Sequence, residues 1–219
     1  MPTAIITGAS RGLGQALSTA LIKAGWTVVA DGRTLADTPS DALPAEVIRV
    51  PGDVTDPTHR AALVEAALAT GRLDLLVNNA GILGPSPQPP LADYPLETLR
   101  EVFEVNVVAP LALTQLALPA LRKADGAVVT ITSDAAVEAY AGWGGYGAAK
   151  AAAEQASNVL ATEEPNLRVW WVDPGDLRTQ MHAEAFPGED ISDRPLPETV
   201  APAFVDLVTT RPESGRVRL

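Results

Sequence analysis

Two residues four positions apart, Tyr146 and Lys150, have types and spacing that could do chemistry, and Ser133 precedes the tyrosine by thirteen positions. On a helix, residues four apart share one face, so the ammonium would lie beside the phenol and favour the phenolate. Such a phenol can give or take the proton that accompanies hydride transfer at a carbonyl or alcohol carbon. An ordinary pair on a helix surface has the same spacing, so the rest of the chain must decide.

A glycine-rich loop near the N-terminus, Thr7-Gly8-Ala-Ser-Arg-Gly12-Leu-Gly14, lies between a predicted strand and a predicted helix. Glycines at such a junction let the backbone approach the pyrophosphate of a dinucleotide, and the free N–H groups of the helix start meet its charge. A glycine-rich turn without a ligand is the alternative. The loop therefore indicates, but does not by itself prove, a dinucleotide site.

The elements that must position these residues follow from an alternation along the chain of short runs rich in Val and Ile with longer helical patterns. This alternation predicts an α/β fold: a single-domain, Rossmann-like, doubly wound parallel sheet of about seven strands with helices on both faces. The predicted strands cover 3–7, 27–31, 47–50, 74–78, 127–132, 168–172 and 216–219, and the predicted helices cover 12–24, 57–69, 96–123, 147–162 and 197–209.

The chain length of 219 residues is that of one domain, and 47% apolar residues suffice for a core. We therefore assign residues 1–219 to one dinucleotide-binding and catalytic domain. Two segments, 84–90 and 173–195, have the composition of loops. Because ligands bind at the carboxyl ends of strands in such folds, we expect the second loop to close over a substrate.

Charge and composition exclude several classes of function. Sixteen basic against 27 acidic residues give a net charge of −11, which argues against a nucleic-acid or anionic membrane partner. The absence of cysteine excludes disulfides and thiolate metal sites. His59 and His182 are too isolated to form a metal pair, so we expect surface or loop roles for them and no metal.

Membrane and export segments are not expected either. The N-terminus has no basic region followed by an apolar stretch, and the apolar stretch over 105–121 is interrupted by polar residues and two prolines. We predict that this stretch is too short to span a membrane. A cytoplasmic protein is the compatible expectation.

Taken in order, these motifs resemble the short-chain dehydrogenase/reductase family, in its subgroup with a TGxxxGxG loop and a YxxxK pair. The resemblance runs essentially end to end and rests also on Asn78-Asn79-Ala80-Gly81, Asn106, Ser133 and Pro174-Gly175 with Thr179 and Met181. It implies an NAD(P)(H)-dependent oxidoreductase that transfers a hydride between the nicotinamide and a small carbonyl or alcohol substrate. A non-catalytic cofactor sensor or scaffold of the same fold is the alternative, and an isomerase or dehydratase of the wider superfamily is a third.

The resemblance also implies the roles of the catalytic residues, Asn106, Ser133, Tyr146 and Lys150. The tyrosine would be the acid/base, the serine would donate to the substrate oxygen, and the lysine would also hold the nicotinamide ribose. From the residues alone, Pro110 has no N–H for the carbonyl of Asn106, so the helix should bend there. In the family, this carbonyl holds a water that relays protons to the lysine.

The cofactor-binding residues implied by the resemblance come from the glycine loop, the ends of the strands and the loop after the sixth strand. They are Gly8, Ser10, Arg11, Gly12, Leu13, Gly14, Arg33, Asp53, Val54, Asn79, Ala80, Gly81, Tyr146, Lys150, Pro174, Gly175 and Thr179. Asp53 would receive the adenine amino group, and a structural turn aspartate is the alternative there.

The choice of cofactor depends on charge after the second strand. Gly32 stands where NAD-dependent relatives place an aspartate, and NADP-dependent relatives often have basic residues at the places of Arg11 and Arg33. Two guanidinium groups suit a 2′-phosphate, so NADP(H) is favoured and NAD(H) is the alternative. Asp31 is one residue earlier, and strand alternation should turn it away from the ribose.

The predicted helix 96–123 is apolar on more than one stripe, which is typical of a helix that also contacts another subunit. Because family members pair their equivalent helices, a homodimer or homotetramer is expected. The chain is shorter than typical family members, which puts the second interface of a tetramer in doubt. The acidic residues Glu184, Glu189 and Asp190 argue weakly against an anionic substrate.

Overall fold

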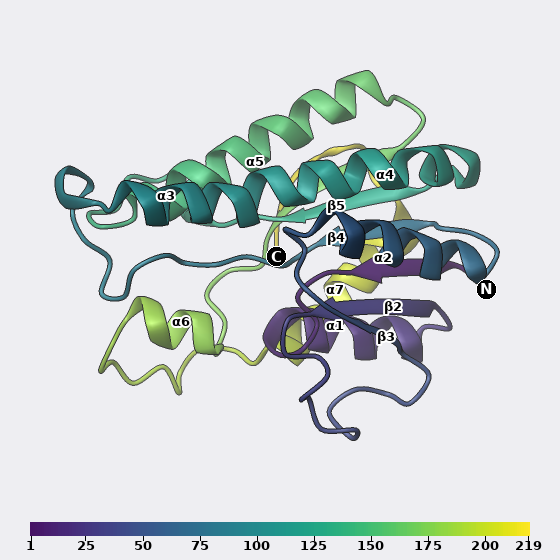
Figure 1. Cartoon of the computed structure of the whole chain (residues 1–219), viewed down its shortest axis with the longest axis horizontal. Coiled ribbons are helices and arrows are strands. Elements are labelled where there is room, and N and C mark those ends of the chain that lie inside the picture. Colours follow the sequence, from purple (N-terminus) through teal and green to yellow (C-terminus); the bar gives the residue numbers. More distant parts are fainter.

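The computed structural model describes all residues from Met1 to Leu219, and a seven-stranded parallel sheet runs through its centre (Figure 1). The strands are β1 (Thr3–Ile6), β2 (Thr27–Gly32), β3 (Ile48–Pro51), β4 (Leu75–Asn78), β5 (Ala127–Ile131), β6 (Arg168–Asp173) and β7 (Gly215–Arg218). Their order is β3-β2-β1-β4-β5-β6-β7, and the predicted fold class and all seven predicted strands are confirmed. The order reverses between β1 and β4, which is where such sheets open a crevice for a ligand.

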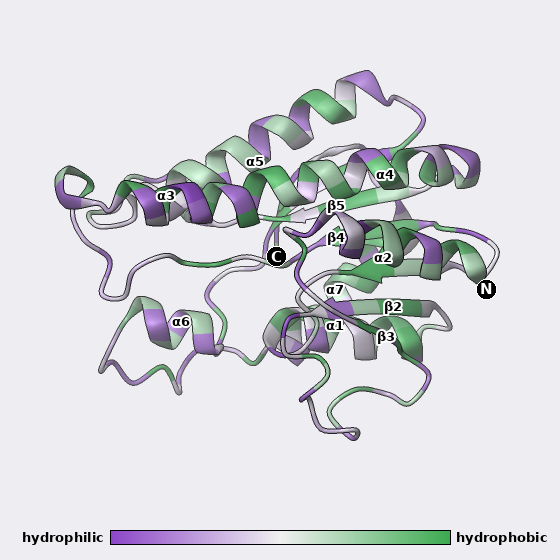
Figure 2. Cartoon of the chain, viewed as in Figure 1, coloured by the Kyte–Doolittle hydropathy of each residue, from purple (hydrophilic) through white to green (hydrophobic).

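Helices cover both faces of the sheet (Figure 1). Helices α1 (Gly12–Lys23) and α7 (Pro197–Thr210) pack on each other at one face, and α2 (Pro57–Ala69), α4 (Ala109–Ala124) and α5 (Gly144–Glu163) cover the other. The central strands are rich in hydrophobic residues, coloured green in Figure 2, and these pack on both faces of the sheet. In β1, for example, Ile6 packs into the core under α1 and α7, whereas its neighbour Ile5 packs into the core on the other face.

The long helix predicted over 96–123 is interrupted where the sequence placed the bend. It consists of α3 (Leu96–Phe103), a π-helical turn η2 (Glu104–Val108) and α4. The N–H of Ala109 donates to the carbonyl of Glu104, five residues back. Because Pro110 cannot donate to Asn106, the wider turn is the local solution for this backbone.

The continuous helical segment Leu96–Ala124 is 29 residues long, and its most apolar window has a mean hydropathy of 1.4. Length and composition alone would allow this longer helical segment to cross a membrane, so insufficient length is no argument against it, and the expectation that the stretch 105–121 does not span a membrane stays a prediction. Only 33% of that window is buried, although the segment packs against α2 and α5. A core helix with one outward apolar face meets the same criterion, so length and composition do not distinguish the two.

Two features near the predicted site differ from the sequence prediction. Helix α5 begins at Gly144, three residues early, because its glycines allow close packing: a Cβ on Gly145 would lie 2.2 Å from the ring of Tyr94. The loop 173–195 contains a short helix, α6 (Gln180–Ala185), which stands apart from both helix layers (Figure 1). Short 3₁₀ turns, η1 (Leu91–Asp93) and η3 (Asp134–Ala136), complete the chain.

Candidate active site

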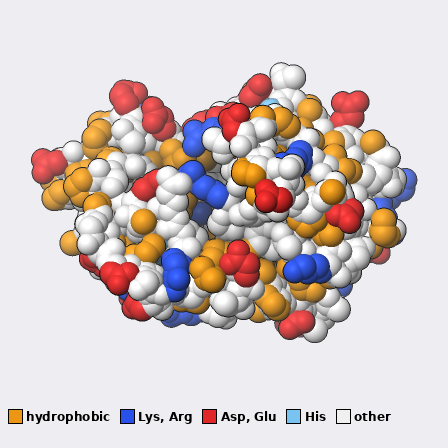
Figure 3. Space-filling view, turned by 90° about the horizontal axis from the view of Figure 1, so that it is seen from below, with side chains coloured by type: hydrophobic (Ala, Val, Ile, Leu, Met, Phe, Trp, Pro, Cys, Tyr) orange, Lys and Arg blue, Asp and Glu red, His pale blue; other side chains and the backbone are white.

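A cavity of about 870 Å³ lies at the carboxyl ends of the strands, between the glycine loop, α5 and the loop after β6. Figure 3 shows the hollow on this face, with basic side chains along it. The predicted site residues that line it are Gly8, Ser10, Arg11, Gly12, Leu13, Arg33, Asp53, Val54, Asn79, Ala80, Gly81, Ser133, Tyr146, Lys150, Pro174, Gly175 and Thr179. Gly14 and Asn106 do not line the cavity and lie behind it.

The glycine loop is packed so tightly that two of its glycines have no substitute. Gly8 has a φ of +67°, and a Cβ there would lie 2.8 Å from the Cα of Ala80. A Cβ on Gly14 would lie 2.4 Å from the carbonyl oxygen of Gly8 and 2.6 Å from the amide nitrogen of the Asn79 side chain. These contacts hold the backbone open toward the cavity, as a pyrophosphate site requires.

The segment after β4 is bonded directly to the start of this loop. The backbone N–H groups of Asn79 and Ala80 both donate to the hydroxyl of Thr7, each at 2.9 Å. The Asn79 side chain donates to the carbonyl of Thr7 at 2.7 Å. The two strand ends on either side of the crevice are thereby fixed relative to each other, which supports the cofactor-binding prediction for both segments.

Tyr146 and Lys150 lie together on α5 and are buried, at 7% and 5% exposure. The Nζ of Lys150 is 5.4 Å from the centre of the tyrosine ring and donates to the carbonyl of Ile131, at the end of β5, at 2.8 Å. Burial lowers the pKa of Lys150 to about 8. The hydrogen bond to Ile131 and the helical spacing from Tyr146 therefore hold the ammonium of Lys150 between the end of β5 and the phenol.

The expectation that Lys150 makes the phenolate of Tyr146 easier to reach is not met by the protein alone. Burial raises the pKa of Tyr146 above its usual value, and the negative charges of Asp134 and Asp173 raise it further. The sequence could not show this, because both carboxylates approach the phenol only in the fold. A positively charged ligand bound beside the phenol would lower this pKa.

Ser133 follows β5 and faces the cavity, but its hydroxyl is already engaged. It donates to Oδ1 of Asp134 at 3.0 Å and accepts from the N–H of Ala135 at 3.2 Å. The other carboxylate oxygen of Asp134 accepts from the hydroxyl of Tyr140 at 3.0 Å. To donate to a substrate oxygen, the serine hydroxyl has to turn away from Asp134, so this aspartate takes part in setting its orientation.

Asn106 lies in the π-helical turn η2, and its side chain is buried behind the cavity wall. Its amide makes two hydrogen bonds with the backbone of Ile82, accepting from the N–H and donating to the carbonyl, both at 2.9 Å. A Cβ on Gly81 would lie 2.9 Å from its Oδ1 and 3.6 Å from the Nζ of Lys150. The side chain thus clamps the turn onto the segment after β4, near Lys150. The water relay through its carbonyl stays a prediction.

Asp31 is turned away from the ribose, as strand alternation predicts, whereas His59 corrects an expectation from the sequence. Asp31 is held inward: Oδ1 accepts from the N–H of Gly8 at 2.7 Å, and Oδ2 lies 3.0 Å from Nε2 of His59. It therefore supports the glycine loop and is not free to turn toward a ribose. His59 is buried at 8% exposure, so the prediction of a surface role was wrong. His182 is buried too, with its ring 4.8 Å from that of Phe186.

The two predicted phosphate-binding arginines, Arg11 and Arg33, are exposed side chains at the cavity. A side chain at position 32 would displace Ser10, because a Cβ on Gly32 would lie 3.2 Å from the Oγ of Ser10. Asp53 accepts from both the N–H and the hydroxyl of Thr55, so the structural-turn alternative is present. Although burial raises the pKa of Asp53, these bonds and the charge of Arg33 lower it overall. Its adenine contact stays a prediction.

The loop 173–195 reaches back over the glycine loop. Thr179 caps α6 by accepting from the N–H of His182 at 3.2 Å. Its methyl group would lie 3.6 Å from a Cβ on Gly12, so it stands above the first helix turn. Trp143, just before α5, packs its ring 5.8 Å from that of Tyr146 and 5.7 Å from that of Phe186. An aromatic wall thus joins the loop to the tyrosine.

Sequence reasoning missed one group of residues at this site. Asp173, at the end of β6, is paired with Arg216 and Arg218 of β7. The available signal was an aspartate just before Pro174-Gly175 and two arginines at alternate positions of the last strand, which share one face. Neither pattern is informative until the order of β6 and β7 in the sheet is known.

A doubly wound parallel sheet, with a glycine loop at its switch point and a buried tyrosine and lysine at the same cavity, defines a dinucleotide-dependent oxidoreductase. Comparison with known proteins agrees: the family model for short chain dehydrogenases matches residues 2–190. The chain belongs to the short-chain dehydrogenase family. It is an NAD(P)-dependent oxidoreductase that acts on small molecules, and nothing found supports a non-catalytic sensor.

Three similar proteins illustrate the relationship. The uncharacterized oxidoreductase YciK of Escherichia coli is 33% identical over 215 residues, which cover 93% of this chain and 84% of that protein. Benzil reductase ((S)-benzoin forming) of Saccharomyces cerevisiae is 32% identical over 218 residues, which cover 94% of this chain and 80% of that protein. A solved structure of a short chain dehydrogenase from Shigella flexneri, complexed with NADP, is similar to this chain with a TM-score of 0.88 and 29% sequence identity. The match covers 99% of this chain and 96% of the Shigella flexneri chain.

Proposed function

We propose that this protein is an NADP(H)-preferring carbonyl reductase or alcohol dehydrogenase in which Tyr146 is the catalytic acid/base. The observation that carries the proposal is the placement of Tyr146 and Lys150, buried side by side at the cavity that the glycine loop also lines. When bound, the nicotinamide cofactor supplies or accepts the hydride. The residues of the chain must then supply the proton, orient the substrate and exclude water.

In the reducing direction, the phenol of Tyr146 donates its proton to the oxygen of the substrate carbonyl. The raised pKa keeps the phenol protonated before the reaction. Lys150, held by the carbonyl of Ile131, restores the proton from its own ammonium, whose pKa of about 8 allows it to give one up near neutral pH. Ser133 turns its hydroxyl from Asp134 to the substrate oxygen and stabilises the charge that develops there.

The proposed preference for NADP(H) rests on the charge around Gly32. Arg11 and Arg33 are exposed at the same cavity, where either guanidinium can reach a 2′-phosphate. The aspartate that could have opposed this phosphate, Asp31, is instead held by Gly8 and His59. The NADP complex of the Shigella flexneri relative supports the same choice.

For the substrate, we propose an uncharged carbonyl or alcohol with an apolar or aromatic substituent. Leu83, Trp143 and Met181 line the cavity and pack in one apolar cluster with Tyr146. Asp176 and Glu184 also line the cavity and would repel an anion. The name of the benzil reductase relative refers to an aromatic diketone, which makes such diketones the first compounds to assay.

We further propose that the protein is a homodimer or homotetramer that pairs through α4. Val108, Leu111 and Leu116 on this helix segment are exposed by 43–48%. A solvent-facing apolar stripe of this length on a core helix is typical of a subunit contact. Light scattering coupled to size exclusion would measure the mass, and Leu111→Glu should shift it toward that of one chain.

The experiment that tests the function measures oxidation of NADPH and NADH in the presence of ketones, aldehydes, quinones and aromatic diketones. Tyr146→Phe removes only the phenolic oxygen and should lower turnover about 100-fold or more. Tyr94→Phe is the matched control, because the Tyr94 hydroxyl is buried without a partner and its loss should leave turnover intact. Tight NADPH binding without turnover of any of these compounds by the wild type would contradict the proposal.

A further inference from the structure

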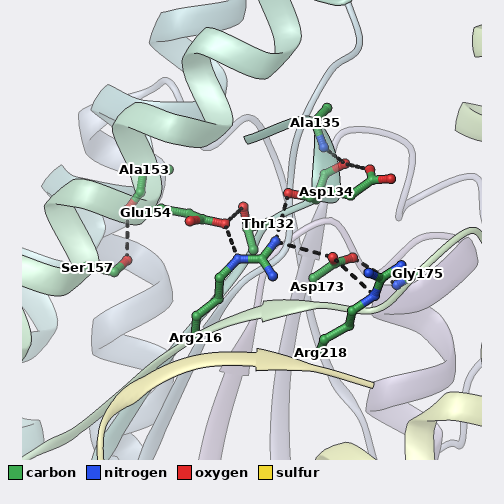
Figure 4. A network of polar contacts seen from close by, with 11 residues as sticks. Thr132, Asp134, Ala135, Ala153, Glu154, Ser157, Asp173, Gly175, Arg216 and Arg218 are labelled. Carbon is green, nitrogen blue, oxygen red and sulfur yellow. Dashed lines mark hydrogen bonds and ion pairs between the residues drawn. The ribbon is translucent and has the colours of Figure 1, made fainter. Parts of the chain in front are cut away.

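The last strand of the sheet places an arginine at the active-site end of three other elements. Arg216 of β7 donates from Nε to Oε1 of Glu154 at 3.0 Å. Its Nη2 donates to the backbone carbonyl of Ser133 at 3.2 Å and to Oδ2 of Asp173 at 3.3 Å. Figure 4 shows the guanidinium between these groups, with Glu154 on one side and Asp173 on the other. It does not line the cavity.

Each partner of Arg216 belongs to an element that carries a proposed site residue. Glu154 is one helical turn after Lys150 on α5, and its Oε1 also accepts from the hydroxyl of Thr132 at 2.8 Å. Ser133 is the residue whose hydroxyl faces the cavity. Asp173 ends β6, and its Oδ1 accepts from the N–H of Gly175 at 3.0 Å. One guanidinium therefore joins α5, the end of β5 and the start of the loop over the cavity.

Arg216 also supplies positive charge next to a carboxylate of the site. The Asp173 side chain is 3% exposed, and its nearest cations are Arg216 at 3.3 Å and the largely exposed Arg218 at 3.9 Å. Asp173 is one of the two carboxylates that raise the pKa of Tyr146, after burial itself. Arg216 is the closer and less exposed of the two cations, so it compensates more of that charge than Arg218 does.

We propose that Arg216 is a positioning residue of the active site, which holds the strand ends carrying Ser133 and Asp173 in register with α5 and neutralises Asp173 beside Tyr146. This inference rests on the proposed role of Tyr146 as acid/base. It assigns a function to the C-terminal strand beyond completing the sheet. A fork of three donors to three different elements is a geometry that arginine provides and lysine does not.

The charged groups that act on Tyr146 come from several elements. Lys150 is on its own helix, Asp134 is in the turn η3 after β5, and Asp173 is at the end of β6. The same cavity is also lined by charged or titratable residues of the loop 173–195 and of α3, namely Asp176, Arg178, His182, Glu184 and Glu101. A variant at Arg216 keeps all of these groups in the chain, and Arg216→Lys, which keeps the charge but loses the fork, separates the effect of the lost charge on Tyr146 from that of a displaced Asp134 or Asp173.

The test compares Arg216→Met and Arg216→Lys with the wild type during alcohol oxidation by NADP⁺ across a pH series. Oxidation needs the phenolate, so the rate rises with pH through the pKa of Tyr146. The Met variant leaves Asp173 less compensated, which disfavours the phenolate and should move this rise about 0.5–1 unit to higher pH. The Lys variant keeps the charge but loses the fork, so the rise should stay in place while kcat falls about tenfold.

The KM for NADP⁺ should be nearly unchanged in both variants, because Arg216 does not line the cavity. Arg122→Gln is the matched control: it removes an arginine that donates to Glu164 at 2.9 Å, at the other end of α5. It should leave both kcat and the pH profile unaltered. Thermal unfolding of each variant checks that it is folded under assay conditions.

A second readout separates this proposal from the proposed function. The ultraviolet absorbance of the phenolate, titrated with NADP⁺ bound and compared with Tyr146→Phe, gives the pKa of Tyr146 without turnover. An upward shift in Arg216→Met supports the proposal even where no substrate is turned over. A pKa and a pH profile that stay at the wild-type position, with only a lower unfolding temperature, would overturn it and leave Arg216 a purely structural residue.

Discussion

Replacing His59 by Leu should destabilise the fold, because the buried carboxylate of Asp31 would lose a hydrogen-bond partner. The two side chains are 7% and 1% exposed, and Nε2 lies 3.0 Å from Oδ2. The variant leaves a buried carboxylate with a single remaining bond, from the N–H of Gly8. A buried donor or acceptor that loses its partner costs more than the bond itself contributes.

The expected loss of folding free energy follows from the kind of interaction that His59→Leu removes. Loss of a hydrogen bond to a charged, buried group costs about 2–3 kcal/mol. Fully buried ion pairs cost up to about 5 kcal/mol when one partner is removed, but Asp31 keeps its bond to Gly8 and borders the cavity, so the lower range applies. For a chain of this length, such a loss lowers the Tm by roughly 4–12 °C.

The loss of stability in His59→Leu should also depend on pH. Burial already raises the pKa of Asp31 in the folded protein, although the bonds from His59 and Gly8 oppose this. Without His59 the folded-state pKa rises further above its unfolded value. The folded variant then binds the proton more readily than the unfolded chain, so its stability increases as pH falls through that range. The penalty of His59→Leu should therefore be smaller when stability is measured at about pH 5 than when it is measured at about pH 7.5.

Urea unfolding followed by circular dichroism would measure this at both pH values for His59→Leu, Asp31→Asn and the double variant. The double variant should be more stable than the sum of the two single losses predicts, by about 1 kcal/mol or more, because the residues are in contact. His182→Leu is the control, a buried histidine whose nearest carboxylate, Asp176, is 61% exposed and 3.9 Å away. A penalty for His59→Leu that is absent, or that does not change with pH, would refute the reasoning.

Three further outcomes are expected from single substitutions, and a fourth from the pH dependence of stability. Arg33→Ala should raise the KM for NADPH about tenfold or more and leave that for NADH unchanged, and an equal change in both would contradict the phosphate role. Gly14→Ala should abolish cofactor binding in a fluorescence titration, because its Cβ would lie 2.4 Å from a backbone oxygen. Pro110→Ala restores a donor for the carbonyl of Asn106, so turnover should fall without loss of stability. Because burial lowers the pKa of Lys150 from 10.5 to about 8, the unfolded chain binds more protons between these values; stability relative to Lys150→Met should therefore rise with pH there, by up to about 3 kcal/mol.

Much of the fold was predictable because its signals are local. The central strands lie between helices on both faces, so most of their residues are apolar and each run is visible in the sequence. Tyr146 and Lys150 are one helical turn apart, the proline at position 110 acts on a carbonyl four residues back, and the glycines after β1 form a short motif. All seven strands, the bend in the long helix and the family itself followed from patterns of this kind.

What only the tertiary structure decided involves partners that are far apart in the chain. Asp31 meets His59 across 28 positions, and Arg216 meets Ser133 across 83. The energy of such a pair exists only when the backbone has already brought the two groups within bonding distance, so no local pattern reports it. The sequence alone determined which chemistry this protein has the residues to perform. The fold determined which charges act on its tyrosine, because electrostatic interaction depends on distance in space and on burial.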